Sequence, residues 1–109
     1  MSIPVRKLVT CVVEKGISYK PYERITRIGG YSRQGLWVLN VEEAINNIKS
    51  GTEGYFILTA NNKELNIILA DFAGKEYLKT ETDHDSPDNL LGLPSFYGNA
   101  LINHIARKN

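Results

Sequence analysis

The densest group of side chains that could take part in chemistry is an acidic stretch, Glu81-Thr82-Asp83-His84-Asp85-Ser86-Pro87-Asp88. Its carboxylates and the imidazole of His84 offer ligands of the kind that divalent cations use. The stretch lacks the glycine at the sixth position and the closing glutamate of an EF-hand loop. We therefore interpret it first as a turn whose Asp side chains bond the local backbone. A metal-dependent hydrolase centred on Asp83, His84 and Asp85 is the alternative.

A nucleophilic site has few residues to draw on. Cys11 is the single cysteine, and only His84 and His104 could serve it as a base. Because Cys11 lies among β-branched residues, we expect a buried, unreactive thiol. Ser86 or Ser95 could supply the hydroxyl of a Ser-His-Asp triad, but no Gly-x-Ser-x-Gly motif positions either of them. The sequence therefore favours a protein that is not an enzyme and has neither a metal nor a cofactor.

Basic and aromatic residues are interleaved in the amino-terminal third. Residues 1–39 hold seven Lys or Arg residues against two Glu, whereas residues 76–90 hold five acidic residues and one lysine. Cations beside stacking rings are what single-stranded nucleic acid requires, although the sequence pI of about 7.8 is low for a dedicated nucleic-acid binder. The residues singled out for an anion or nucleic-acid site are Arg24, Arg27, Tyr31, Arg33, Trp37 and Lys79.

Gly29-Gly30 is predicted to form a tight turn, and it matches no phosphate-loop motif. If residues 76–80 lie beside the amino-terminal strands, Arg24, Arg27 and Lys79 could converge on this turn, with its backbone amides facing an anion. Tyr31 would then lie at the rim of the pocket and Trp37 on its floor. In the alternative interpretation the arginines pair with nearby glutamates at the surface, where ion pairs contribute little.

The clearest element that could position such residues is a helix over residues 41–50. Asn40 and Glu43 have the spacing of a capping box, and Gly51 can end the helix in the left-handed conformation. Four apolar residues at positions i, i+3, i+4 and i+7 form one stripe that predicts a buried face. They are Val41, Ala44, Ile45 and Ile48.

The remaining pattern is that of strands. Residues 55–59, 65–70 and 76–80 predict an antiparallel meander joined by short turns. Two further strands are expected over 8–13 and 22–28, with a short one over 34–39. The fold class is therefore α+β: an antiparallel twisted sheet of about five strands, with the 41–50 helix packed on it and a C-terminal helix. The expected core comprises Leu8, Val12, Ile25, Ile28, Trp37, Ala44, Ile45, Ile48, Phe56, Leu58, Ile68 and Leu78.

Residues 1–94 are interpreted as one domain and residues 95–109 as a helical extension of it, since apolar residues recur there at i, i+4 and i+8. The 109-residue chain is 42% hydrophobic and 23% charged, which is ordinary for a globular protein. It has no apolar run that would span a membrane and no signal peptide. With its single cysteine, it is expected in the cytoplasm.

Five short motifs occur in fixed order along the chain: Ile25-Thr26-Arg27-Ile28-Gly29-Gly30, Trp37, Val41-Glu42-Glu43-Ala44-Ile45, Tyr77-Leu78-Lys79-Thr80 and Asp88-Asn89-Leu90-Leu91-Gly92-Leu93-Pro94. In this order and spacing they resemble a small, mostly bacterial family known only as domain of unknown function 3892. The resemblance extends to Pro94. It implies a kind of domain but no activity.

Three functions stay open at this point. The first is a small non-catalytic module that acts through protein contacts, either with itself or with a partner. The second is nucleic-acid or phosphate-ligand binding through the basic and aromatic residues near 22–37. The third is the hydrolase centred on the acidic stretch.

Overall fold

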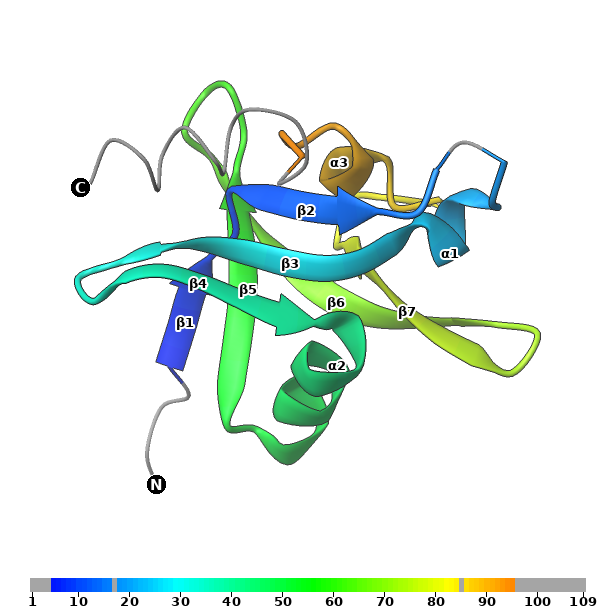
Figure 1. Cartoon of the computed structure of the whole chain (residues 1–109), viewed down its shortest axis with the longest axis horizontal. Coiled ribbons are helices and arrows are strands. Elements are labelled where there is room, and N and C mark those ends of the chain that lie inside the picture. Colours follow the sequence, from blue (N-terminus) through cyan, green and yellow to red (C-terminus); the bar gives the residue numbers. More distant parts are fainter. Residues whose placement is uncertain (1–4, 17, 85, 96–109) are drawn as a thin grey trace.

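The computed structural model describes residues 5–16, 18–84 and 86–95, which form seven strands and three helices (Figure 1). The helices are α1 (Pro21–Arg24), α2 (Val41–Ser50) and α3 (Asp88–Leu91). The strands are β1 (Val5–Leu8), β2 (Cys11–Glu14), β3 (Ile25–Ser32), β4 (Gly35–Asn40), β5 (Glu53–Leu58), β6 (Glu64–Phe72) and β7 (Lys75–Thr80).

The strands form two sheets. One has four strands in the order β1-β5-β6-β7, and the other has three in the order β2-β3-β4. The β1–β5 pair is parallel and every other pair is antiparallel. Figure 1 shows the three-stranded sheet crossing in front of the four-stranded one, with α2 below the end of β4.

The two sheets meet where β1 passes into β2. The backbone N–H of Val9 donates to the carbonyl of Phe56 in the first sheet, and that of Thr10 donates to the carbonyl of Gly29 in the second. Two consecutive residues thus satisfy their backbone groups in different sheets. One bent segment therefore serves as an edge strand of both.

Helix α2 forms as its sequence predicts. The capping box between Asn40 and Glu43 is present, and Gly51 ends the helix with φ 75°. Ala44 and Ile45 are buried, so the apolar stripe faces the space between the sheets. The prediction of a helix over residues 41–50 is confirmed.

The core fills the space between the two sheets and α2. Its members are buried residues of both sheets and of α2 and α3: Val9, Val12, Ile28, Ala44, Ile45, Tyr55, Ile57, Leu65, Ile67, Leu78 and Leu90. The prediction that Leu58 and Ile68 belong to the core is wrong. They are 41% and 36% exposed, on the faces of their strands that point away from the core. Their neighbours Ile57 and Ile67 point inward instead.

The α+β class is confirmed, but the prediction of one antiparallel sheet of about five strands is wrong. The predicted strand over 8–13 is divided, since its residues pair in two different sheets. The strand expected from Tyr22 begins only at Ile25, after the short helix α1. The predicted C-terminal helix lies outside the described residues. Within the described part of the chain, no helix has the length and apolar character needed to cross a membrane.

Candidate functional site

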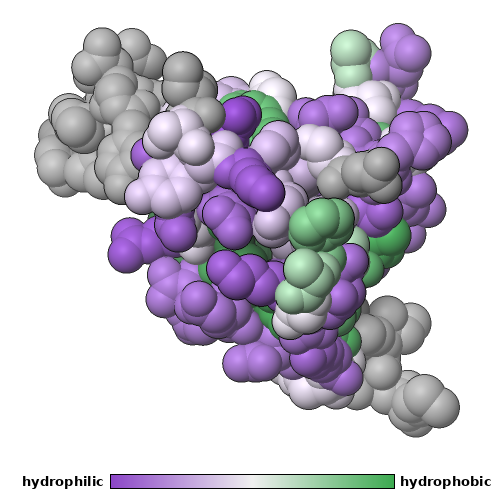
Figure 2. Space-filling view, turned by 90° about the vertical axis from the view of Figure 1, so that its right-hand side faces the viewer, coloured by the Kyte–Doolittle hydropathy of each residue, from purple (hydrophilic) through white to green (hydrophobic). Residues whose placement is uncertain are grey.

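A groove of about 460 Å³ lies between the edge of β7 and the ends of the strands of the three-stranded sheet. Residues 75–78 of β7 form one side, and residues 25–27 of β3 with residues 40–42 at the start of α2 form the other. Val13, Lys15, Tyr22, Glu23 and Pro87 complete the lining. Figure 2 shows the end of the molecule that carries α1 and the β6–β7 turn. Most of its surface there is polar, with small hydrophobic patches between the polar residues.

The groove combines a buried floor with a charged rim. Val13, Tyr77, Leu78 and Pro87 are buried. Its rim carries three cations, Lys15, Arg27 and Lys75, and three carboxylates, Glu23, Glu42 and Glu76. The charges of the lining therefore balance.

Some of these charges already have partners within the chain. Glu76 accepts from Lys49 at 2.6 Å, and Glu23 lies 3.5 Å from Lys75. Arg27 has a neutral partner, because its Nε donates to Oδ1 of Asn40 at 3.1 Å. In the described part of the chain no carboxylate forms an ion pair with Arg27 or Lys15. These two cations are thus available to an anionic group of a ligand.

The edge of β7 is a second feature of the groove. β7 is the last strand of its sheet and pairs only with β6 in the described structure. An unpaired strand edge presents backbone N–H and C=O groups that can pair with an added strand. The groove is therefore suited to an extended chain.

The six residues predicted for an anion site lie in different places. Arg27 lines the groove, whereas the other five do not. Arg24 ends α1, where its Nε donates to the carbonyl of Tyr19 at 2.8 Å. Lys79 in β7 donates to the carbonyl of His84 at 2.8 Å. The remaining three belong to the β3–β4 hairpin: Tyr31, Arg33 and Trp37.

The predicted Gly29-Gly30 turn is wrong. Both glycines lie inside β3, where they pair with Val38 and Trp37 of β4. The turn occurs after Ser32 instead. The expected nest of backbone amides for an anion therefore does not form at this position, since the amides belong to a strand ladder.

The acidic stretch forms a hydrogen-bonded turn around Asp83. Its Oδ2 accepts from the backbone N–H of Thr80 at 2.9 Å and from the Thr80 hydroxyl at 3.0 Å, while Oδ1 accepts from the N–H of Asn89 at 3.2 Å. Asn89 in turn donates to Oγ1 of Thr80 at 2.8 Å. Among the residues described, no group of three or more His, Cys, Asp or Glu could hold a metal ion. Asp85 lies outside them.

The single cysteine has the environment expected of an unreactive thiol. Cys11 is buried in β2, and burial raises the pKa of its thiol despite a contact with the hydroxyl of Thr10 at 3.8 Å. A thiol with a raised pKa is a weaker source of thiolate at neutral pH. This favours the structural interpretation over a nucleophile.

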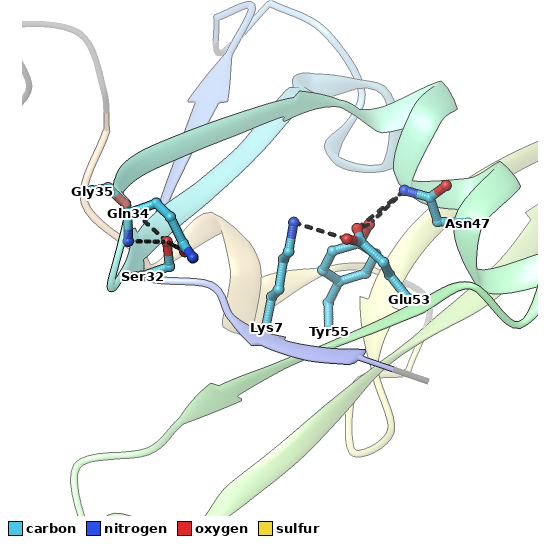
Figure 3. A network of polar contacts seen from close by, with 7 residues as sticks. All are labelled: Lys7, Ser32, Gln34, Gly35, Asn47, Glu53 and Tyr55. Carbon is cyan, nitrogen blue, oxygen red and sulfur yellow. Dashed lines mark hydrogen bonds and ion pairs between the residues drawn. The ribbon is translucent and has the colours of Figure 1, made fainter. Parts of the chain in front are cut away.

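A polar network that the sequence did not predict joins β1, α2 and β5 (Figure 3). Lys7 lies 2.8 Å from Oε2 of Glu53, and the hydroxyl of Tyr55 donates to Oε1 at 2.7 Å. Asn47 donates to the same Oε1 at 3.2 Å and to the Tyr55 hydroxyl at 2.9 Å. The ammonium of Lys7 also lies 5.1 Å from the centroid of the Trp37 ring. Lys7 belongs to β1 and Asn47 to α2, so the fold brings them to Glu53 and Tyr55 of β5.

This network changes the proton affinity of its members. Burial acts against the charged carboxylate of Glu53, yet the contacts from Lys7, Tyr55 and Asn47 together hold its pKa below the ordinary value. Burial, with the Glu53 carboxylate beside it, raises the pKa of Tyr55, so the phenol stays a donor. Folding lowers the pKa of Glu53. The Glu53 carboxylate therefore stabilises the folded protein fully at pH values above the pKa that Glu53 has in the unfolded chain. That contribution is lost as the pH falls through the folded-state pKa.

We expect Lys7→Met to lower the free energy of unfolding at neutral pH by about 2 kcal/mol, because it leaves a largely buried carboxylate without its cation. It should also move the midpoint of acid unfolding to higher pH. Lys49→Met is the control, since the Lys49–Glu76 side chains are 50% and 37% exposed, against 28% and 18% for Lys7 and Glu53. Circular dichroism during acid titration measures both variants, and equal shifts would contradict the prediction.

Comparison with known proteins shows the family. Residues 9–94 match the family model described as protein of unknown function DUF3892. No curated protein and no solved structure matches the chain. The match covers most of the sequence, from the junction of the two sheets to the segment after α3. The chain belongs to the DUF3892 family, and the resemblance seen in the five motifs is confirmed.

Proposed function

We propose that this member of the DUF3892 family is a non-catalytic protein-interaction module whose groove binds an extended segment of a partner protein. The observation that carries the proposal is that the groove follows the free edge of β7. A peptide laid in the groove can add a strand to this edge, which supplies backbone hydrogen bonds for affinity. Its side chains then meet the rim.

The chemistry of the rim supports a peptide over a nucleic acid. A polyanion requires a surface with an excess of cations, whereas the lining of this groove holds as many carboxylates as cations. A peptide with apolar residues and charges of both signs satisfies such a lining. Arg27 and Lys15 would receive its acidic side chains, because no carboxylate of the described chain forms an ion pair with them.

Selection of a displayed random peptide library on the immobilised protein tests the proposal. We expect the selected peptides to contain acidic residues, and Arg27→Glu to weaken their binding by about tenfold or more, as expected when like charges meet in an interface. Lys63→Glu is the matched control, because Lys63 is exposed in the β5–β6 turn and does not line the groove. The same charge reversal at Lys63 should leave affinity unchanged.

A second measurement separates the two partner classes. Amide signals of residues 75–78 should shift on peptide binding in NMR spectra, since these residues form the strand edge in the groove. Salt-dependent binding of a labelled single-stranded oligonucleotide, with no peptide selected, would replace the proposal with the nucleic-acid function.

A further inference from the structure

Four strands lie at the ends of the two sheets, and one of them differs from the others. β1 contains Arg6 and Lys7, β2 contains Glu14, and β7 contains two lysines and a glutamate. β4 reads Gly-Leu-Trp-Val-Leu-Asn and has neither a charge nor a proline. Charges and prolines are the usual means by which edge strands avoid pairing with other chains. β4 lacks this protection.

The face beside this edge is apolar and partly exposed. Val38 of β4 is 40% exposed and Tyr31 of β3 is 45% exposed. Leu36 pairs with Tyr31 and packs on the buried residues Cys11 and Val13 of β2. Leu36 can reach across the sheet because the β3 residue next to it on this face is Gly29, which has no side chain. A strand added to β4 would continue this apolar face.

We propose that a second copy of the chain pairs with the edge of β4 that is unpaired among the described residues, antiparallel and about a two-fold axis at Val38. A two-fold axis makes the contact self-complementary, so that each copy supplies the same strand. Pairing Val38 with its symmetry mate places Leu36 opposite Asn40 of the partner. In this register the side chains of Leu36 and Val38 from both copies lie on one face of the combined six-stranded sheet, so the apolar face continues across the contact.

Charges at the two ends of β4 support this register. The same pairing brings the β3–β4 turn, which carries Arg33, to the start of the partner's α2, whose first turn carries Glu42 and Glu43. Arg33 is exposed, and none of the carboxylates in the described residues forms an ion pair with it. Opposite charges therefore meet twice in the dimer, once at each end of the contact.

This inference does not require a ligand in the groove, because the edge of β4 and the edge of β7 belong to different sheets. The two sites share only residues 40–42, where β4 passes into α2. A single strand pair makes a small interface, at the low end of the range for specific complexes. We therefore expect a dimer that dissociates on dilution, with a monomer able to bind peptide in the same way.

Sedimentation analysis of the full chain over a range of concentrations tests the dimer. The wild-type protein should pass from monomer to dimer as its concentration rises, and Val38→Lys should abolish the dimer because it puts a like charge at the two-fold axis. Ile68→Lys is the matched control, since Ile68 is 36% exposed on β6. A wild-type monomer at every concentration, or an equal effect of both variants, would overturn the proposal.

A charge exchange tests the register. Arg33→Glu and Glu42→Arg should each weaken dimerisation several-fold by placing like charges together, and the double variant should recover the wild-type affinity. Glu43 is left in place because it caps α2. Failure of the double variant to recover would overturn the register, and peptide binding in the groove should be the same in Arg33→Glu as in wild type.

Discussion

Gly30→Ala is expected to lower the free energy of unfolding by about 3 kcal/mol, and the melting temperature by about 15 °C. A Cβ atom at Gly30 would lie 2.3 Å from the carbonyl oxygen of Leu8 and 3.3 Å from Nε1 of Trp37. The first of these neighbours is backbone, so it cannot turn aside as a flexible side chain does. Alanine therefore forces β1 and β3 apart where the chain passes from one sheet to the other.

The matched control is Gly54→Ala in β5. The nearest atom to a Cβ at Gly54 is Cγ of Arg6 at 4.0 Å, which is ordinary contact. Neither glycine has a positive φ, so both backbones accept alanine and the two variants differ in the space around the new atom. Gly54→Ala should be neutral or slightly stabilising. Thermal unfolding of both variants measures the difference, and equal melting temperatures would contradict the close approach.

The sequence predicts local elements better than their arrangement. Helix α2 was predictable to the residue, because its cap, its apolar stripe and its terminal glycine are all adjacent in the sequence. The division of residues 5–14 between two sheets has no such signal. The hydrogen bonds of Val9 and Thr10 go to Phe56 and Gly29, and only the folded chain brings those partners close.

The two central strands show why the core was partly mispredicted. β5 and β6 contain continuous apolar runs, in which both faces of the strand carry hydrophobic side chains. A shift of one residue exchanges the inner and outer faces of a strand. Ile57 and Ile67 are buried while their neighbours Leu58 and Ile68 are exposed, and nothing in the composition of these runs distinguishes the two sets.

Of the six residues predicted for an anion site, only Arg27 lines the groove. A basic residue in an alternating stretch indicates an exposed position, and Arg27 does lie at the rim of the groove. The other wall comes from β7, some fifty residues later in the chain, and the neutral partner Asn40 comes from the end of β4. The groove is a product of the crossing of the two sheets, which pattern alone did not reveal.

The edges of β7 and β4 suit different partners. β7 carries charges along its length and lies in a groove with charges on both walls, so we expect it to discriminate among sequences that present complementary charges. β4 is uncharged and lies beside an apolar face, so it suits a partner with the same pattern, which a second copy has. A module of this size can thus hold one contact to itself and another to a partner.

Asp83→Ala is expected to lower the free energy of unfolding by about 3 kcal/mol, because it removes the acceptor of three hydrogen bonds. Two of the donors belong to Thr80, whose side chain is 0% exposed, so water cannot replace the lost carboxylate there without a rearrangement. The third donor, the N–H of Asn89, lies in α3, which also buries Leu90 against the core. The variant therefore loosens the connection between β7 and α3.

Asp71→Ala is the control for Asp83→Ala, since Asp71 is an exposed carboxylate in β6, and it should change stability by less than about 0.5 kcal/mol. Asp83→Asn should fall between the two, because its amide can accept from Thr80 or from Asn89 but not from both. Urea unfolding of the three variants gives this order if the carboxylate holds the turn.

The hydrolase interpretation predicts a different pattern: unchanged unfolding in Asp83→Ala, together with a loss of Mn²⁺ binding in a calorimetric titration. Because both oxygens of Asp83 already accept hydrogen bonds from the chain, we expect the stability order and no effect on metal binding.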